Sequence, residues 1–397
     1  MTTRSRPFFV QAVGNPREVG EAHGRAAKAL VGENIALYSR RFREEWGLSR
    51  DAVLDRARRY ARVIRDTDEA YTAAMEGVAR GSEQDLRDIV ALNARYEIVY
   101  SAYSERGRAE AAVRAPSGCT ALAILPERTA KGHLIMAQNW DWISGVRGIV
   151  LETHVDGRPG TLAFTEAGIV GAKIGLNDAG VGLLINGLVS NLDAWDRLGM
   201  PFHVRCWRIL QATSLDEAVR TVREPPGSCS SNFLIGHAGS GAARVLDLEA
   251  SPAGVAEIPP EAGVLVHANH FCRAKELGVW EPLLEERTST YLRHRRMEEL
   301  LTGTTRRTPF SVEDVKSYLR DHEGRPNSIC RHPETERAPS EWYETVASVI
   351  LDMNARRLMM ANGSPCEMGY AGFRLTKDRG SPHQPATKAR SPRKRTL

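Results

Sequence analysis

The sequence lacks long hydrophobic runs, paired-cysteine motifs and phosphate-binding glycine motifs. No stretch of its 397 residues approaches the roughly 18 consecutive apolar residues of a membrane-spanning helix. The basic start, residues 1–7, is not followed by the apolar segment of a secretory signal, so we expect a cytoplasmic protein without a membrane partner. Neither GxGxxG nor GxxxxGKS/T occurs, and a nucleotide-binding fold therefore has no support in the sequence.

The six cysteines form no CxxC pair and no Cys/His cluster with the spacing of zinc ligands. In a chain without a secretory signal we expect free thiols, with no disulfide framework, no metal site and no cofactor. Five are typical of small buried hydrophobic residues, namely Cys206, Cys229, Cys272, Cys330 and Cys366. Cys119 differs because it stands where two sequence patterns meet.

The formal net charge of +5 is concentrated at the C-terminal end. Residues 377–397 contain seven basic residues and one acid among Pro, Ser and Gly, which is typical of a disordered basic tail. The rest of the chain is nearly neutral, so we expect no nucleic-acid partner. Its composition, 42% hydrophobic and 26% charged, is that of a globular protein and excludes collagen-like and disordered classes.

Two periodicities divide the chain at Cys119. Before it, apolar residues recur at helical spacing and predict helices at 16–30, 51–65, 70–78 and 85–96. After it the period falls to two, and the predicted strands span 120–125, 134–139, 149–155, 161–165, 173–176, 182–186, 232–236, 243–248, 255–258, 264–268, 345–352 and 357–361. Helices are predicted at 201–213, 214–222, 287–301 and 311–320. This order favours an α+β fold in which helices cover sheets.

The Gly118–Cys119 bond is suited to self-cleavage by an N-to-S acyl shift. Gly118 tolerates strained backbone angles and leaves its carbonyl open to the thiol of Cys119. Hydrolysis of the resulting thioester leaves Cys119 with a free α-amine, whose pKa of about 8 allows it to act as general base for its own thiol. Gly-Cys dipeptides are common, so a purely structural thiol remains an alternative at this point.

Eight stretches of sequence, spread over roughly residues 12–375, carry a resemblance to a known family. They are Glu18–Gly24, Glu76–Ser82 with Ile89–Glu97, Gly118–Thr120, Gln138–Asp141, Glu166–Gly171, Leu176–Gly180, Val266–His270 and Asn327–Arg331. In this order they resemble the acyl-coenzyme A:6-aminopenicillanic acid acyltransferase (isopenicillin N acyltransferase) family of self-cleaving cysteine N-terminal nucleophile (Ntn) hydrolases. Each stretch is weak alone, and the ordered set is specific.

The resemblance implies an αββα sandwich, in which two antiparallel sheets pack together with helices outside. It implies a helical segment of residues 1–118, a catalytic core of residues 119–376 and the tail 377–397. Cys119 is expected to open a strand at the centre of a sheet. The two fragments are expected to stay associated after cleavage, because the helical segment supplies part of the core.

The resemblance also implies roles for individual residues. Cys119 matches the nucleophile and Asp141 the carboxylate that holds the new α-ammonium group. Asn269 matches the amide of the oxyanion hole, and Asn186 a residue of the acyl pocket or oxyanion hole. Arg331 matches an arginine that favours the thiolate. Without the family, Asp141 is typical of a turn, Asn269 of a strand end and Arg331 of a surface ion pair.

The implied substrate is a small acyl amide or acyl thioester. Hydrolysis is favoured over transfer to an amine, because it needs no second substrate site and no coenzyme A phosphate signature is present. The final Arg-Thr-Leu is not a peroxisomal Ser-Lys-Leu address. Two alternatives stay open: a catalytically silent binding protein of the same fold, and a papain-type protease that pairs Cys119 with His23, His267 or His270.

Overall fold

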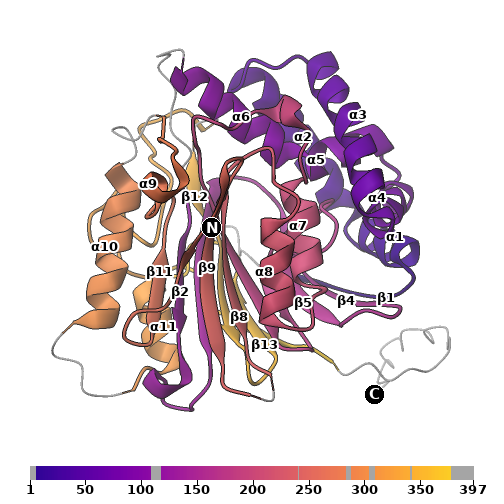
Figure 1. The fold of residues 1–397 in the computed structure, drawn as a ribbon. Helices are drawn as coiled ribbons and strands as arrows, with labels where there is room; N and C mark the ends of the chain where they lie inside the picture. Colours follow the sequence, from indigo (N-terminus) through magenta and orange to yellow (C-terminus); the bar gives the residue numbers. More distant parts are fainter. Residues whose placement is uncertain are drawn as a thin grey trace, which may run out of the picture.

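The computed structural model describes most of the chain between residues 6 and 376 (Figure 1). The described residues are 6–108, 118–239, 241–282, 288–303, 309–339 and 342–376. The predicted basic tail, 377–397, and residues 114–117 before Gly118 lie outside them. Within these ranges, the helices are all too short or too polar to cross a membrane.

The region before Cys119 is largely helical, as the periodicity predicted. Its helices are α1 (Pro16–Ala26), α2 (Lys28–Glu44), α3 (Arg50–Thr67), α4 (Glu69–Ser82), α5 (Leu86–Asn93) and α6 (Arg95–Arg108). Asn15 caps α1 in a reciprocal capping box with Glu18, and Pro16 supplies the first helical residue. The region also contains a strand that the sequence analysis did not predict, β1 (Phe8–Gly14).

Helices α1 and α4 cross in direct backbone contact. A Cβ added at Gly20 would overlap the carbonyl oxygen of Ala74, and one at Gly24 would overlap that of Val78. A Cβ at Gly77 would in turn overlap the backbone of α1. Two of the family-like stretches, Glu18–Gly24 and Glu76–Ser82, therefore carry their glycines because only glycine allows so close an approach.

The rest of the chain builds two sheets. The eight-stranded sheet has the order β1-β4-β5-β6-β7-β8-β9-β10, and the six-stranded sheet has the order β11-β2-β3-β12-β13-β14. The strands after β1 are β2 (Thr120–Ile124), β3 (Ile135–Ile143), β4 (Gly148–Val155), β5 (Thr161–Glu166), β6 (Ile174–Asn177), β7 (Val181–Gly187), β8 (Ser231–His237), β9 (Arg244–Ser251), β10 (Gly254–Ile258), β11 (Val264–His267), β12 (Tyr343–Asp352), β13 (Arg357–Ala361) and β14 (Ala371–Arg374). The later helices are α7 (Phe202–Ile209), α8 (Leu215–Arg223), α9 (Ala274–Leu277), α10 (Thr288–Thr302) and α11 (Val312–Leu319).

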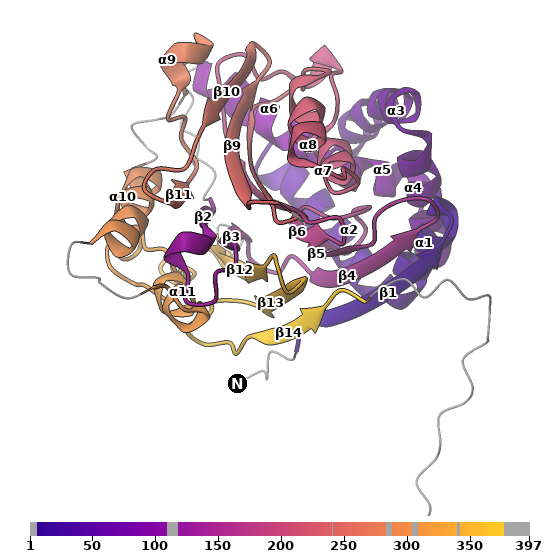
Figure 2. The same ribbon diagram turned by 60° about the horizontal axis from the view of Figure 1, so that its bottom comes forward.

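The layers follow the expected αββα order (Figures 1 and 2). The helices α1 to α8 lie on the side of the eight-stranded sheet, while α10 and α11 cover the six-stranded sheet. Side chains of α10 and α11, such as Met297 and Leu319, share one apolar cluster with Leu122 and Ile350 of the six-stranded sheet. The predicted sandwich is confirmed, with one difference: β1 pairs with β4 in parallel.

The parallel strand β1 makes the N-terminal region part of the sandwich. Residues 8–14 pair in register with residues 149–155 of β4, so β1 forms the edge of the eight-stranded sheet. Tyr71, Tyr103 and Ile98 of the helical region are fully buried in the same apolar cluster as Phe164 and Phe233 of the sheet. Residues on both sides of Gly118–Cys119 therefore share one core.

Strand β3 is longer than the alternating pattern predicted. It continues through Trp140, Asp141 and Trp142 to Ile143, and every residue in it is buried. A strand buried on both faces shows no alternation of polar and apolar residues, so its end cannot be located from periodicity. This extension places Asp141 inside the sheet rather than in a turn.

Candidate active site

Cys119 lies immediately before β2 and is 4% exposed. Strand β2 lies between β11 and β3, and its first residue, Thr120, pairs with Asn139 of β3. Two residues further along β3 is Asp141, which pairs with Thr345 of β12. The register of three neighbouring strands thus brings the thiol of Cys119 and the carboxyl of Asp141 into one buried region.

Asp141 has one carboxyl oxygen that is hydrogen-bonded and one that is not. Its Oδ1 accepts a hydrogen bond of 2.7 Å from the hydroxyl of Thr345. Its Oδ2 is buried and has no hydrogen-bond partner among the described residues. Burial raises the pKa of Asp141 to about 6, although the charges of Arg293 and Arg331 act in the opposite direction. A cation placed at Oδ2 would offset the free-energy cost of burying the ionised carboxylate.

The thiol of Cys119 is neutral in this environment. Burial raises its pKa to about 12, and the nearby carboxyl of Asp141 adds to the effect. The charges of Arg293 and Lys173 and a hydrogen bond from the backbone of Asp141 lower it only in part. Since a thiol is a weak nucleophile until its proton is removed, chemistry at Cys119 requires a base close by.

Two asparagine amides lie beside Cys119. The Nδ2 group of Asn186 donates to the carbonyl oxygen of Cys119 at 3.2 Å. The Nδ2 group of Asn269 donates to the carbonyl oxygen of Gly187 at 3.0 Å. A Cβ at Gly118 would overlap the side-chain amide of Asn269, so that amide packs directly on the residue before Cys119. Only glycine fits at position 118 in this arrangement.

Arg293 is a residue of this site that the sequence analysis missed. It lies on α10, is 1% exposed, and its Nη1 donates to the carbonyl oxygen of Cys119 at 2.6 Å and to Oγ1 of Thr120 at 2.9 Å. Its Nη2 donates to Oδ1 of Asn269 at 3.1 Å. The sequence did contain a signal for Arg293, because this charged residue falls on the same face of the predicted helix as Thr290, Met297 and Leu301, which is the buried face. A charged residue on such a face marks either a buried ion pair or a functional site.

The backbone of Arg331 is connected to the carboxyl of Asp141 through the hydroxyl of Thr345. Its N–H donates to Oγ1 of Thr345 at 2.9 Å, and Thr345 in turn donates to Asp141. Its guanidinium group lies 3.7 Å from a carboxylate oxygen of Glu334, the ion pair that its position in the sequence suggested. The charge of Arg331 acts on Asp141, whereas Arg293 is the arginine that bonds to Cys119.

The three histidines considered for a Cys–His pair have hydrogen-bond partners elsewhere. Nε2 of His23 accepts from the N–H of Gly168 at 3.2 Å. The ring of His267 lies between the carbonyl oxygen of Ala268 and the carboxylate of Glu249, at 2.8 and 2.9 Å. Nδ1 of His270 is 3.0 Å from the hydroxyl of Thr290. Their contacts are those of structural histidines, and they do not favour a papain-type pair.

A narrow pocket opens beside Gly118 and Cys119. Its walls come from both sides of the Gly118–Cys119 bond, and the cavity between them is small, about 20 Å³. Aromatic rings dominate the walls, with Tyr96 stacked at 4.0 Å on both Tyr100 and Phe202. The other lining residues are Arg95, Trp140, Asp141, Trp142, Lys173, Ile185 and Gly187. Walls of this kind favour contact with an apolar or aromatic group, although the cavity must widen to admit one.

The charged residues of this pocket are held in a buried network. The carboxylate of Glu166 forms ion pairs with both Arg95 and Lys173 and accepts a hydrogen bond of 2.5 Å from the hydroxyl of Tyr38. Burial lowers the pKa of Lys173 to about 7, and its ammonium group lies 3.4 Å from the centre of the Trp140 ring. These contacts fix the N-terminal helices to the sheet.

Two comparisons with known proteins, one with family models and one with individual sequences, find the same family. The family described as acyl-coenzyme A:6-aminopenicillanic acid acyl-transferase matches residues 128–367. The chain is 27% identical over 362 residues to the acyl-coenzyme A:6-aminopenicillanic-acid-acyltransferase 40 kDa form of Emericella nidulans, covering 90% of this chain and 93% of that protein.

Solved structures give weaker likenesses. An N-acylethanolamine-hydrolyzing acid amidase ortholog of Caenorhabditis elegans aligns with a TM-score of 0.40 and 14% identity, over 59% of this chain and 93% of its own. A mutant of the conjugated bile acid hydrolase from Clostridium perfringens aligns with a TM-score of 0.39 and 10% identity, over 65% of this chain and 92% of its own.

Proposed function

The chain belongs to the acyl-coenzyme A:6-aminopenicillanic acid acyl-transferase family, and on this premise we propose that it is a self-cleaving Ntn enzyme with Cys119 as nucleophile. The observation that carries the proposal is the set of groups around Cys119. Around a thiol whose preceding residue must be glycine lie two side-chain amides, a buried arginine and a carboxyl with one oxygen that has no hydrogen-bond partner among the described residues.

The first reaction is cleavage of the Gly118–Cys119 bond. The thiol of Cys119 passes its proton to the neighbouring carboxylate of Asp141 and attacks the carbonyl carbon of Gly118, and the amide of Asn269, which packs against Gly118, bonds to the oxyanion. The C–N bond then breaks, the nitrogen takes up the thiol proton, and a thioester remains. Water hydrolyses the thioester to the carboxylate of Gly118 and a free thiol.

Cleavage supplies a second base, on the nucleophile itself, for the reactions with substrate. The new α-amino group of Cys119 accepts the thiol proton, so nucleophile and base belong to one residue. In its protonated form the α-ammonium group pairs with Oδ2 of Asp141, the buried oxygen that has no partner among the described residues of the intact chain. The same charge lowers the pKa of the Asp141 carboxyl, since opposite charges favour ionisation.

The mature enzyme then acts on an acyl amide or acyl thioester. The thiolate attacks the carbonyl carbon, Asn269 and a backbone N–H bond to the oxyanion, and the α-ammonium group protonates the leaving amine or thiol. The acyl-Cys119 intermediate passes to water or to an acceptor amine, which regenerates the thiol. Tyr96, Tyr100 and Phe202 line the pocket, so we expect an acyl group with an apolar or aromatic body.

Denaturing mass spectrometry tests the self-cleavage. We expect fragments 1–118 and 119–397, of about 13 and 31 kDa in proportion to their length in a 43.9 kDa chain, and an intact chain for Cys119→Ala. Cys206→Ala, another fully buried cysteine, is the matched control and should cleave. A wild-type chain that stays intact while it turns over substrate, or that has an unreactive Cys119, would refute the proposal.

The partition of the acyl-enzyme separates hydrolysis from transfer. In a panel of N-acyl amines and acyl thioesters, an added amine nucleophile should divert product from acid to amide without changing the rate of acylation. Hydrolysis is the expected outcome without added amine, because water alone completes the cycle. An acyl group trapped on a residue other than Cys119 would contradict the mechanism.

A further inference from the structure

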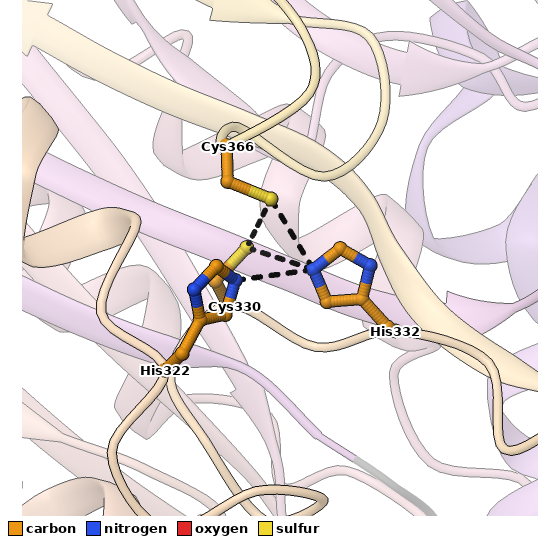
Figure 3. Close-up of side chains that lie close together, drawn as sticks. All are labelled: His322, Cys330, His332 and Cys366. Atoms are coloured by element: carbon orange, nitrogen blue, oxygen red, sulfur yellow. Dashed lines mark hydrogen bonds between the residues drawn. The ribbon is translucent and has the colours of Figure 1, made fainter.

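Four potential metal ligands, none of which lines the pocket of Cys119, converge near the segments that flank β12 and β13 (Figure 3). His322 follows α11, Cys330 and His332 lie in the segment that leads to β12, and Cys366 lies between β13 and β14. Their Nε2 and Sγ atoms all lie within 4.8 Å of one another. Figure 3 shows the side chains pointing from three separate segments toward one common point.

Four of the six distances between the ligand atoms are close to the edges of a small tetrahedron, and the other two are within 4.8 Å. Nε2 of His332 lies 3.1 Å from Nε2 of His322, 3.7 Å from Sγ of Cys330 and 3.2 Å from Sγ of Cys366, and the two sulfurs are 3.6 Å apart. A tetrahedral zinc ion with Zn–S of about 2.3 Å and Zn–N of about 2.0–2.1 Å sets its ligand atoms about 3.3–3.8 Å apart. The cluster therefore needs only slight adjustment to surround such an ion.

Hydrogen bonds among these side chains do not explain the arrangement. Nε2 of His332 is the common neighbour of His322, Cys330 and Cys366. A ring nitrogen has either one lone pair or one proton, so it makes one good hydrogen bond and not three. A cation coordinated by all four atoms satisfies every contact at once.

The other nitrogen of His332 is also placed as in a metal site. Its Nδ1 lies 3.4 Å from a carboxylate oxygen of Glu367, the residue after Cys366. Metal-bound histidines usually hold their second nitrogen in such a contact, which fixes the ring and leaves Nε2 for the metal. Cys330 is buried and Cys366 is exposed, so the site is anchored in the protein and open to an ion from solvent.

We propose that His322, Cys330, His332 and Cys366 bind one zinc ion. Two sulfur and two imidazole ligands in a tetrahedron are the preferred set for Zn²⁺, and four protein ligands leave no open position for substrate. The site is therefore structural. Binding releases the two thiol protons to solvent, and the metal joins the segment before β12 to the β13–β14 connection.

The site borders the residues of the proposed reaction without being part of it. Arg331 lies between the two ligands Cys330 and His332, and its carbonyl oxygen accepts a hydrogen bond of 3.0 Å from Ser364. Its N–H reaches Asp141 through Thr345. Zinc thus fixes the backbone of Arg331 from both sides.

Zinc binding by the full chain tests the proposal without any assay of activity. The purified protein is reduced, stripped with a chelator and titrated with Zn²⁺ against a chromophoric competitor; one ion per chain is expected. Co²⁺ in place of zinc should give the intense visible bands of a tetrahedral site and the near-ultraviolet band of thiolate ligation. Zinc should also raise the unfolding temperature of the stripped protein.

Three variants locate the ion. Cys366→Ser, at an exposed position, should weaken zinc binding by more than about 100-fold while circular dichroism stays unchanged. Glu367→Gln should weaken it by about 10–100-fold, the usual effect of losing a partner of a ligand. Cys272→Ser is the matched control, because Cys272 is exposed and belongs to a second group of possible ligands with Glu249 and His267.

Three results would overturn the proposal. The first is a reduced wild-type chain that binds no more zinc than Cys366→Ser. The second is a zinc ion that is lost in Cys272→Ser, which would place it at the other group. The third is a Cys330–Cys366 disulfide that forms in protein purified with zinc and without reductant, since a bound ion protects both thiolates.

Discussion

Cys119 and Cys330 are both buried thiols that precede a strand of the six-stranded sheet, Cys119 before β2 and Cys330 before β12. Their neighbours differ. Around Cys119 lie a carboxyl, two amides and a guanidinium group, and around Cys330 lie a second thiol and two imidazoles. The groups around Cys119 hold one thiol next to the carbonyl carbon of Gly118. The groups around Cys330, together with its own thiol, place four lone-pair donors around one point.

The difference shows that the partners of a cysteine, and not its burial, indicate its chemistry. Side-chain N–H donors and a buried carboxylate that a cation would stabilise suit a reaction in which charge develops and disappears. Soft sulfur and imidazole donors without an open position suit a permanently bound ion. Arg331 connects the two sites, because it follows Cys330 directly and hydrogen-bonds to Thr345 beside Asp141.

The substitution with the largest expected effect on the Cys119 site adds a single methyl group at Gly118. Gly118→Ala should abolish detectable self-cleavage, because the new Cβ overlaps the amide of Asn269 and displaces either the scissile carbonyl or the oxyanion donor. Cleavage during cell-free synthesis is followed by gel over several hours. Gly241→Ala is the control, since a Cβ there meets no atom within 4 Å. Wild-type cleavage in Gly118→Ala would remove Asn269 from the reaction.

The second test separates an oxyanion donor from a structural amide. Asn269→Ala should slow self-cleavage and, in the chains that do mature, lower turnover, each by roughly 10²–10³, the usual effect of removing one donor. The loss should fall on kcat with little change in KM, because the bond forms in the transition state. Near-normal kcat would assign Asn269 to packing alone.

The third test concerns the pH dependence of stability in the uncleaved chain. The pKa of Asp141 is raised from 3.8 to about 6 in the folded state, so the folded chain binds this proton more tightly than the unfolded chain. The free energy of unfolding should therefore fall as pH rises from about 4 to 6, by on the order of 1–3 kcal/mol.

In a Cys119→Ala background, Asp141→Asn should flatten this decline, measured by urea unfolding at a series of pH values across that window. The exposed Asp156, changed to Asn, is the control and should leave the slope unchanged. An equal decline with and without Asp141 would show that its carboxyl titrates normally.

The smallest effect is expected for the influence of the zinc site on self-cleavage at Cys119. Removing zinc by Cys366→Ser should slow self-cleavage by less than about tenfold, because the metal reaches Asp141 only through Arg331 and Thr345 and many residues share such coupling. Cleavage time courses with and without added zinc measure the effect. A loss as large as that of Asn269→Ala would mean that the two cysteine sites form one functional unit.

Periodicity predicted an α+β fold in which helices cover sheets, because most strands and helices carry their own pattern, while the αββα order of the layers came from the family resemblance. It did not predict β14, whose Ala371–Arg374 lacks the β-branched residues that identify a strand, or β1, a short segment ahead of a helical region. The end of β3 was hidden because burial on both faces removes alternation.

The candidate sites were predictable to different degrees. Asp141 and Asn269 could be named only through the family resemblance, since strand register and not sequence distance brings them to Cys119. Arg293 carried a local signal, a charge on a buried helix face. The zinc ligands had none, because the β12–β13 hairpin separates Cys366 from Cys330 along the chain.

The pairing of β1 with β4 has a consequence for how the mature protein can be handled. Before cleavage, folding is a first-order process within one chain. After the proposed cleavage of Gly118–Cys119, the fragment that carries β1 and α1 to α6 is a separate molecule, and refolding becomes a second-order encounter whose yield depends on concentration. Denatured mature enzyme should therefore recover poorly on dilution, while the Cys119→Ala chain refolds equally well at any dilution.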